Sequence, residues 1–235
     1  MHFLLTNDDG IHAPGLSALE RAIRQMPGAA CTVAAPAAEQ SQCGHRVTTR
    51  EPITVTQDGD RRYIVEGTPA DCVRLALFAF GVQPDFVISG VNAGGNMGQD
   101  LPISGTVAAA REAAFHGRPA AAISHYLVKG LALDWGRVTA WTAELLPELL
   151  AQPLADGEFW NVNYPHLLVG PSPLPPRILC PPCRAPLMVS YETEQVNESI
   201  SRYRYTASYS ARPTEPGSDV EVCFSGNVAV SRLHV

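Results

Sequence analysis

The 235-residue chain lacks any apolar run long enough to cross a bilayer, and its N-terminus lacks the pattern of a secretory signal. Its first residues form a short apolar run that leads directly into acids, whereas a signal peptide begins with basic residues that precede a longer apolar core. We therefore expect a cytoplasmic protein with no membrane partner.

Positive charge is scarce, since 17 Lys and Arg stand against 23 Asp and Glu, and the net charge is −6. An acidic chain is poorly suited to coat nucleic acid, so we expect no nucleic-acid partner. This balance leaves room for a small anionic substrate, because a bound metal ion can supply positive charge locally.

Dense cysteine pairing is also absent, because six cysteines are spread along the chain without the pattern of a disulfide scaffold. Cys180 and Cys183 have the spacing of a redox motif. However, Arg184-Ala185-Pro186 follows them, and this sequence does not begin a helix that would stabilise a thiolate. We expect reduced thiols with structural roles.

The chain does contain short apolar strands that alternate with amphipathic helices, which indicates a doubly wound α/β fold with a mostly parallel sheet. The strand patterns lie at 3–6, 32–35, 85–89, 119–124 and 159–163. The helix patterns lie at 16–26, 69–80, 107–116 and from Asp134 onward. Thr68 and Asp71 form a capping-box pattern before the second helix, and Pro147 should kink the last one or end its regular part.

A β-hairpin is predicted at 47–56 and 62–66, because an Asp-Gly turn signal separates these two loosely alternating segments. The proline-rich stretch 167–186 does not suggest a helix. We assign residues 1–188 to the catalytic domain, with the hairpin as an insertion at about 47–66.

The C-terminal segment 189–235 differs in composition from the rest. Tyrosines, arginines and serines alternate over 189–209 without a strong apolar face, which predicts an extended arm or hairpin. Residues 219–224 and 227–233, on either side of Ser225-Gly226, predict a closing β pair.

Oxygen-bearing side chains follow three of the predicted strands. Asp8 and Asp9 follow the first strand, Ser41 lies beyond the second, and Asn92 follows the strand at 85–89. The carboxyl ends of parallel strands meet at one edge of the sheet, where α/β proteins bind ligands. Adjacent carboxylates repel each other unless a cation binds them, and an oxygen-only set favours Mg²⁺ or Mn²⁺. Four such ligands leave open positions on an octahedral ion, which is typical of a catalytic metal.

A phosphate site is predicted beside these ligands. The stretch 90–100 contains four glycines, which allow backbone N–H groups to approach a ligand, and it includes Asn96. Ser104, Gly105 and Thr106 open the next helix, and a helix N-terminus attracts phosphate.

The roles of the two aspartates stay open at this stage. Adjacent residues of an extended chain point to opposite sides, so Asp8 and Asp9 share one cation only if the backbone turns, which Gly10 permits. Alternatively, Asp8 acts as a general base or nucleophile. His12 and His45 fall near the same loops as candidates for proton transfer. Asp100 is expected to order the loop.

Taken in order, these motifs resemble the SurE family of stationary-phase survival proteins, which are 5′/3′-nucleotidases. The resemblance covers nearly the whole chain and rests on residues 6–10 with 13–15, 35–36 with Ser41, 67–73, 89–94, 96–98, 104–107, 161–165 and 217–220. One departure is local, because many members have glycine directly after the serine, whereas this chain has Gln42 and reaches glycine at Gly44.

The resemblance implies a Rossmann-like domain with a swapped C-terminal arm that builds homodimers, often homotetramers. It implies one divalent cation per subunit, Mg²⁺ or Mn²⁺, on ligands that match Asp8, Asp9, Ser41 and Asn92. It also implies hydrolysis of nucleoside 5′- and 3′-monophosphates. Two alternatives remain: a phosphatase for other phosphate esters or short polyphosphates, and a non-catalytic nucleotide-binding module.

Overall fold

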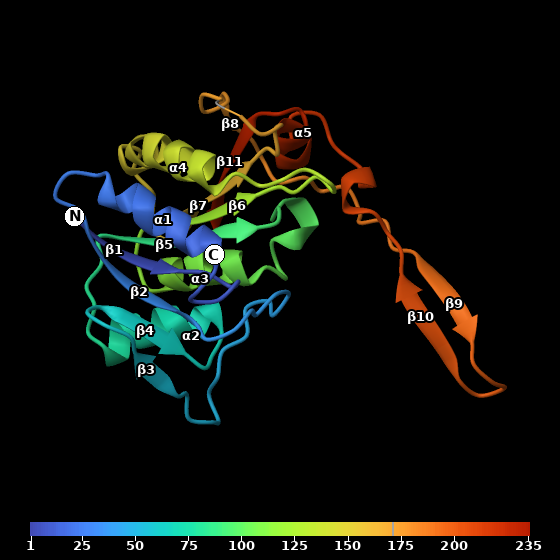
Figure 1. Cartoon of the computed structure of the whole chain (residues 1–235), viewed down its shortest axis with the longest axis horizontal. Helices are drawn as coiled ribbons and strands as arrows, with labels where there is room; N and C mark the ends of the chain where they lie inside the picture. Colours follow the sequence, from blue (N-terminus) through green and yellow to red (C-terminus); the bar gives the residue numbers. More distant parts are fainter. Residues whose placement is uncertain (171) are drawn as a thin grey trace.

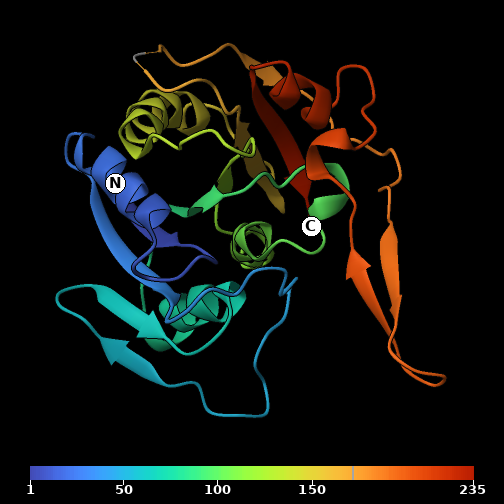
Figure 2. The same cartoon turned by 45° about the vertical axis from the view of Figure 1, so that its right-hand side comes forward.

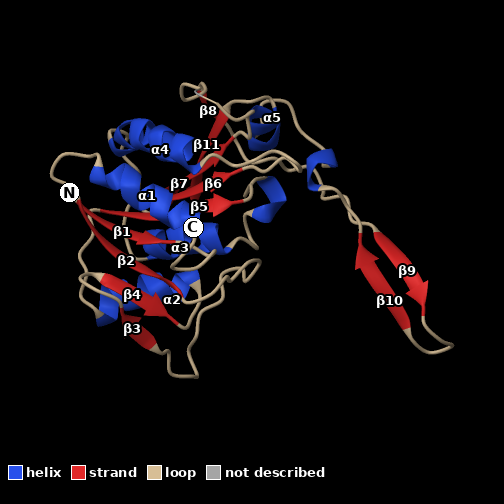
Figure 3. Ribbon diagram, viewed as in Figure 1, coloured by secondary structure: helices blue, strands red, loops and turns tan. Residues whose placement is uncertain are grey.

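A mixed β-sheet runs through the body of the protein, and helices cover both of its faces (Figure 1, Figure 3). The computed structural model describes residues 1–170 and 172–235. The predicted non-helical stretch 167–186 includes Pro171, which lies outside the described residues; the strand β8 occupies part of its remainder. No helix in the described parts of the chain is long and apolar enough to cross a membrane.

Nine strands of the described chain form this sheet in the order β3-β4-β2-β1-β5-β6-β7-β11-β8. Their bounds are β1 His2–Thr6, β2 Ala30–Pro36, β3 Val55–Gln57, β4 Arg62–Val65, β5 Phe86–Ala93, β6 Ala120–His125, β7 Glu158–Tyr164, β8 Arg177–Leu179 and β11 Val228–His234. Neighbours pair in parallel except β3 with β4 and β7 with β11, which are antiparallel. The predicted doubly wound, mostly parallel α/β sheet is therefore confirmed.

The chain direction across the sheet reverses between β1 and β5. From β1 the chain proceeds outward on one side through β2 and β4, and on the other side through β5, β6 and β7. Such a reversal leaves a crevice at the carboxyl ends of the two central strands, because the following loops run to opposite sides. Asp8 follows β1 and Asn92 lies near the end of β5, so both flank this switch point.

Alternate side chains of β1 point into two apolar cores. Phe3 and Leu5 pack on the face covered by α1 and α4, whereas Leu4 packs on the face covered by α2 and α3. Figure 1 shows where these helices lie about the sheet. The helix bounds are α1 Pro14–Arg24, α2 Pro69–Arg74, α3 Gly105–Phe115, α4 Trp135–Leu150 and α5 Asp219–Phe224, with short helical turns η1 Leu75–Ala79, η2 Gly98–Asp100 and η3 Tyr209–Ala211. The predicted capping box is present, since Thr68 and Asp71 each accept the other's backbone N–H.

A separate hairpin, β9 Tyr191–Gln195 and β10 Ser201–Tyr205, projects from the body (Figure 1, Figure 2). It confirms the predicted arm. Both views show that the chain returns from the hairpin to the body, where α5 and β11 follow.

The predicted β pair after the arm is wrong. Residues Asp219–Phe224 form α5, and β11 pairs with β7 and β8 in the main sheet instead. Val220 and Cys223 are both buried, and their spacing of three places them on one face of a helix, whereas in a strand they would point to opposite sides. The pairing of β11 with β7 joins segments far apart in the chain, which local sequence patterns do not report.

Three predicted boundaries also change. The hairpin at 47–66 contains only β3 and β4, and β4 pairs with β2, so it widens the main sheet. The helix α4 continues past Pro147, because Leu145 and Leu149 are buried in the core on either side of it. The strand β5 extends to Ala93 with a register shift after Ser89, so Asn92 lies on an irregular strand end and not in a loop.

Candidate active site

A cleft of about 780 Å³ opens at the switch point of the sheet. It is lined by six of the eight residues that the sequence singled out, namely Asp8, Asp9, Ser41, Asn92, Asn96 and Ser104. The other two, Gly105 and Thr106, form the first turn of α3, directly after Ser104. The segments of Asp8 and Asp9, Ser41 and Asn92, predicted to meet at one sheet edge, therefore do so, with Asn92 on a strand end and not in a loop.

The backbone turns directly after the two aspartates, as a shared cation requires. Gly10 has a φ of +100°, a left-handed conformation that favours glycine, and the amide of Asn7 donates to the Gly10 carbonyl at 2.8 Å. Asp8 is buried and accepts a hydrogen bond from the Thr106 hydroxyl at 2.5 Å. Asp9 is half-buried and accepts the backbone N–H of Ala93 at 3.1 Å. A carboxylate has about four acceptor positions, so both retain capacity for a cation.

The electrostatics of the pair favour a bound cation. Burial raises the pKa of the Asp8 carboxyl to about 6, the charge of Asp9 adds to this, and the Thr106 hydroxyl opposes it. Burial also raises the pKa of Asp9, to which the Glu39 carboxylate contributes, while the Ala93 N–H opposes it. Two carboxyls that burial holds toward their neutral forms become anions readily when a divalent ion lies beside them.

Ser41 and Asn92 supply neutral oxygens to the same cleft. The Ser41 hydroxyl donates to Glu39 at 2.6 Å, which leaves its lone pairs available. The amide nitrogen of Asn92 donates to the Gly94 carbonyl at 2.8 Å, so its amide oxygen is the atom left for a ligand. Gln42, the residue after Ser41, has a φ of +57°, a left-handed backbone conformation that favours glycine.

The donor set therefore fits a hard divalent cation. Two carboxylates, a hydroxyl and an amide oxygen line the cleft, and oxygen ligands suit Mg²⁺ or Mn²⁺. Among the described residues, no group of three or more His, Cys, Asp and Glu side chains is arranged to hold a metal ion. Arg212 is the one cationic side chain among the described lining residues.

The N-terminus of α3 approaches the Asp8 carboxylate closely. Ser104 caps the helix by accepting the Val107 N–H at 3.1 Å. Gly105 is required at the next position, because a Cβ there would lie 2.8 Å from the Asp8 Cβ and 3.0 Å from its Oδ2. The backbone N–H groups that begin α3 and the carboxylate thus share one corner of the cleft.

Two predicted phosphate-binding side chains have different partners in the structure. The Thr106 side chain is fully buried and its hydroxyl donates to Asp8, so this side chain positions the acid. The Asn96 amide nitrogen donates to Ser124 at 2.8 Å and lies 3.5 Å from the Thr106 hydroxyl. Asn163 accepts the Asn96 backbone N–H at 2.8 Å, which fixes this part of the glycine-rich segment.

Asp100 orders its loop, as predicted, and its partners come from the C-terminal segment. It accepts the Tyr209 hydroxyl at 2.8 Å and an Arg212 guanidinium N–H at 2.5 Å. Asp219 accepts the Gly98 N–H at 2.9 Å in the same way. Sequence reasoning missed these three partners, because Arg212 lies 112 positions from Asp100 and no local pattern links them.

The remaining candidates from the sequence lie outside the described lining of the cleft. The His45 ring contacts the buried Glu112 of α3 at 2.6 Å, and neither His45 nor His12 belongs to the described lining of the cleft. Cys180 and Cys183 are buried free thiols within a small apolar cluster.

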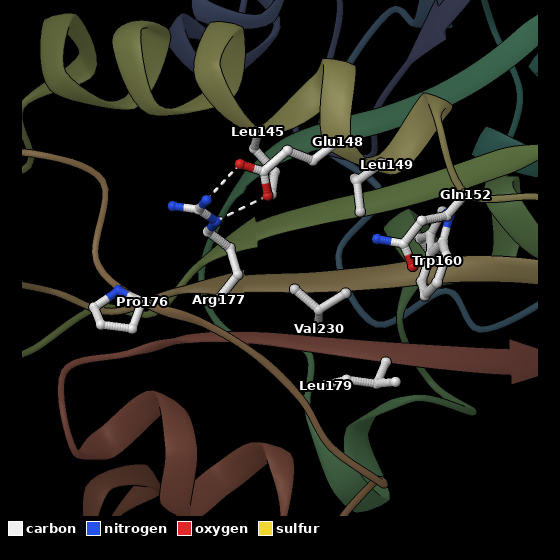
Figure 4. A pocket seen from close by; sticks show the side chains of 9 residues that line it. All are labelled: Leu145, Glu148, Leu149, Gln152, Trp160, Pro176, Arg177, Leu179 and Val230. Atoms are coloured by element: carbon white, nitrogen blue, oxygen red, sulfur yellow. Dashed lines mark hydrogen bonds and ion pairs between the residues drawn. The ribbon is translucent and has the colours of Figure 1, made fainter.

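A second pocket lies away from these residues, between α4 and the sheet edge at β8 (Figure 4). Its lining combines apolar side chains such as Trp160 and Val230 with an ion pair between Arg177 and Glu148. None of the predicted site residues belongs to this lining among the residues that the structure describes.

The fold and the cleft define an α/β protein whose sheet switch point combines oxygen donors suited to a hard cation with a helix N-terminus suited to phosphate. A family model described as survival protein SurE matches residues 3–175. The chain belongs to the SurE family.

Individual relatives extend this match over the whole chain. A putative 5′-nucleotidase of Nostoc sp. is 48% identical over 235 residues and covers all of both chains. A 5′-nucleotidase SurE of Cereibacter sphaeroides is 37% identical, covering 99% of this chain and 93% of its own. The crystal structure of the SurE protein from Aquifex aeolicus superposes with a TM-score of 0.86 at 28% identity, covering 100% of this chain and 93% of its own.

Proposed function

We propose that this chain is a metal-dependent nucleotidase that hydrolyses nucleoside 5′- and 3′-monophosphates to nucleoside and phosphate. The observation that carries the proposal is the junction of Asp8, Asp9 and Asn92 with the N-terminus of α3 in one cleft. The names of its relatives agree, since the proteins from Nostoc sp. and Cereibacter sphaeroides are named as 5′-nucleotidases.

One divalent cation, Mg²⁺ or Mn²⁺, would be held by Asp8, Asp9, Ser41 and Asn92. When bound, such a cation neutralises phosphate charge and makes water a stronger acid and nucleophile. The chain itself supplies the rest of the arrangement. Backbone N–H groups at the start of α3 donate to phosphate oxygens, and the helix dipole favours their negative charge.

Asp8 is held by Thr106 and by burial, and it has one orientation toward the cleft. We assign Asp8 as a cation ligand, because its carboxylate adjoins the start of α3 and the Asp9 side chain. An Asp8→Asn variant distinguishes this role from that of a general base for the attacking water. A variant that still binds the cation but does not turn over would identify Asp8 as the base.

The decisive measurement is phosphate release from a panel of nucleoside 5′- and 3′-monophosphates, ribose 5-phosphate and a short polyphosphate, with Mg²⁺, Mn²⁺ or chelator. We expect turnover of the nucleotides that the chelator abolishes. Asp8→Asn and Asn92→Ala should each lower kcat/KM by at least about 100-fold, which is roughly 3 kcal/mol of transition-state stabilisation.

A matched control is Asp60→Asn, which removes an exposed carboxylate from the turn between β3 and β4, away from the cleft. It should keep wild-type turnover. Nucleotide binding without metal-dependent turnover by the wild type would identify a binding module and refute the proposal. Turnover confined to non-nucleotide esters would refute the substrate assignment alone.

We also propose that the hairpin β9–β10 assembles the chain into homodimers or homotetramers. Tyr203, Arg202 and Arg204 are exposed on it outside the cleft, and tyrosine and arginine are enriched at protein interfaces.

We further propose that the protein is cytoplasmic, because all six cysteines are free and would stay reduced there.

A further inference from the structure

The C-terminal segment supplies one wall of the cleft that holds the predicted metal ligands. Beside the acidic and amide side chains, the lining includes six residues of this segment, namely Tyr191, Tyr205, Ala207, Ser208, Tyr209 and Arg212, and Leu187 and Met188 just before it. The cleft is thus polar at the end where the cation and phosphate would bind, and aromatic where the arm joins the body. A phosphate and a cation alone would leave most of a cleft of this volume empty.

Two of these tyrosines form a pair with free ring surfaces. Tyr191 and Tyr205 lie directly opposite each other in the antiparallel hairpin, so their side chains share one face. Their ring centroids are 5.7 Å apart with an interplanar angle of 75°. Each side chain is 57% exposed although it lines the cleft, so ring surface remains available to a flat ligand.

Tyr209 differs because its own contacts fix it in place. Its hydroxyl donates to the Asp100 carboxylate at 2.8 Å, and the Gly95 carbonyl is a second acceptor within reach at 3.0 Å. The Arg212 guanidinium lies over its ring at 4.7 Å from the centroid. These contacts tie the base of the arm to the glycine-rich segment, and so they set where the Tyr191–Tyr205 pair stands relative to the catalytic end.

The other face of the hairpin carries charge. There Glu192 lies opposite Arg204, and Glu194 lies opposite Arg202. The aromatic side chains are thus confined to one face, and only the pair nearest the body lines the cleft, whereas Tyr203 lies further out on the same face. An aromatic contact next to a phosphate site is the arrangement that binds a nucleobase, because any base can stack on such rings.

We propose, building on the nucleotidase function above, that Tyr191 and Tyr205 form the nucleobase-binding subsite of this enzyme. The arm thereby determines substrate class: it favours phosphate esters that carry a base over base-free sugar phosphates. Because stacking uses ring faces and not base edges, the subsite accepts purines and pyrimidines alike.

The test compares AMP with ribose 5-phosphate, which presents the same phosphate and sugar without a base. The quantity measured is the ratio of kcat/KM for AMP to that for ribose 5-phosphate, in wild type, Tyr205→Ala and Tyr191→Ala. Loss of one stacking contact should lower this ratio by roughly 5- to 150-fold, since such a contact contributes about 1–3 kcal/mol by alanine substitution. The inhibition constant of adenosine should rise by a similar factor.

Tyr203→Ala is the matched control, because it removes a tyrosine from the same strand and face but outside the cleft. It should keep the wild-type ratio. Light scattering of each variant excludes a change of assembly as the cause. Tyr205→Leu should recover part of the apolar contact but not the stacking, and so give an intermediate ratio.

The outcomes separate this inference from the proposed function. Suppose that the wild type turns over AMP with a divalent cation, and that Tyr191→Ala and Tyr205→Ala both keep the wild-type ratio of kcat/KM for AMP to kcat/KM for ribose 5-phosphate. The nucleobase subsite is then refuted and the nucleotidase function stands. If the wild type releases no phosphate from any nucleotide, the proposed function fails first.

Discussion

The Thr106 hydroxyl donates a 2.5 Å hydrogen bond to Oδ1 of Asp8, and both side chains are buried. This bond joins the first turn of α3 to the acid that follows β1, so one contact aligns the helix N-terminus with the predicted cation ligands. Because the acceptor is a carboxylate in a buried site, the bond is of the stronger, charge-assisted kind.

Replacing Thr106 with valine should lower activity while preserving the fold. Valine has nearly the same shape but cannot donate, so Asp8 loses its orienting contact. A hydrogen bond to a charged group contributes about 1.5–3 kcal/mol, which corresponds to roughly 10- to 150-fold in kcat/KM. Thr106→Ser should restore most of the activity, because it retains the hydroxyl. Equal losses in the valine and serine variants would contradict the proposed contact.

Gly105→Ala should impair the site through a steric clash. Its Cβ would lie 2.8 Å from the Asp8 Cβ, so either α3 or the carboxylate must move. We expect weaker cation binding by calorimetry and at least about a tenfold fall in kcat, or roughly 1.4 kcal/mol. Gly136→Ala is a suitable comparison in the first turn of α4, where the nearest contact would be a carboxylate oxygen at 3.2 Å.

Stability at low pH should depend on Glu112. Burial alone would raise the pKa of its carboxyl, but hydrogen bonds from His45, Arg74 and His116 outweigh burial and lower the pKa to about 2. Their distances to the carboxylate are 2.6, 2.5 and 2.8 Å. Because this pKa lies below its ordinary value of 4.5, the stabilisation is complete above about pH 4.5 and is lost as the pH falls toward 2.

Urea denaturation of Glu112→Gln between pH 7 and pH 2 tests this expectation. The variant should be less stable at pH 7 by roughly 3 kcal/mol, since three donors lose their anionic partner. The difference from wild type should shrink as the pH falls from 4.5. A constant difference across the range would show that the Glu112 carboxylate is not the group responsible.

If the hairpin assembles the chain as proposed, removal of residues 191–205 should leave monomers. The Thr206 N–H donates to the Ser190 carbonyl at 3.0 Å, so a short Gly-Ser turn can join these residues without moving Tyr209. Light scattering measures the result directly. An unchanged molar mass per particle, after correction for the deleted residues, would exclude the hairpin as the assembly element.

Local sequence was sufficient for the features that depend on short-range chemistry. The apolar run before Asp8 predicted a buried strand, and the Thr68 capping box and the Ser104 cap predicted two helix starts, all of which the structure contains. Segment 219–224 was misassigned because six residues are too few to separate helical from extended periodicity. The prediction of a longer hairpin at 47–66 was wrong for a related reason. Apolar and polar residues alternate only weakly there, and only β3 and β4 pair.

The sequence by itself determined the kinds of ligand atom at the candidate site: two adjacent carboxylates, a hydroxyl and an amide, each at the end of a strand or in the segment that follows it. These identities follow from strand patterns and turn chemistry, which act over a few residues. Only the tertiary structure decided that Thr106 faces Asp8, that Arg212 holds Asp100, and that Tyr191 and Tyr205 line the same cleft. These contacts join segments separated by up to about 200 residues, and they arise from sheet pairing and the return of the arm, which no local pattern encodes.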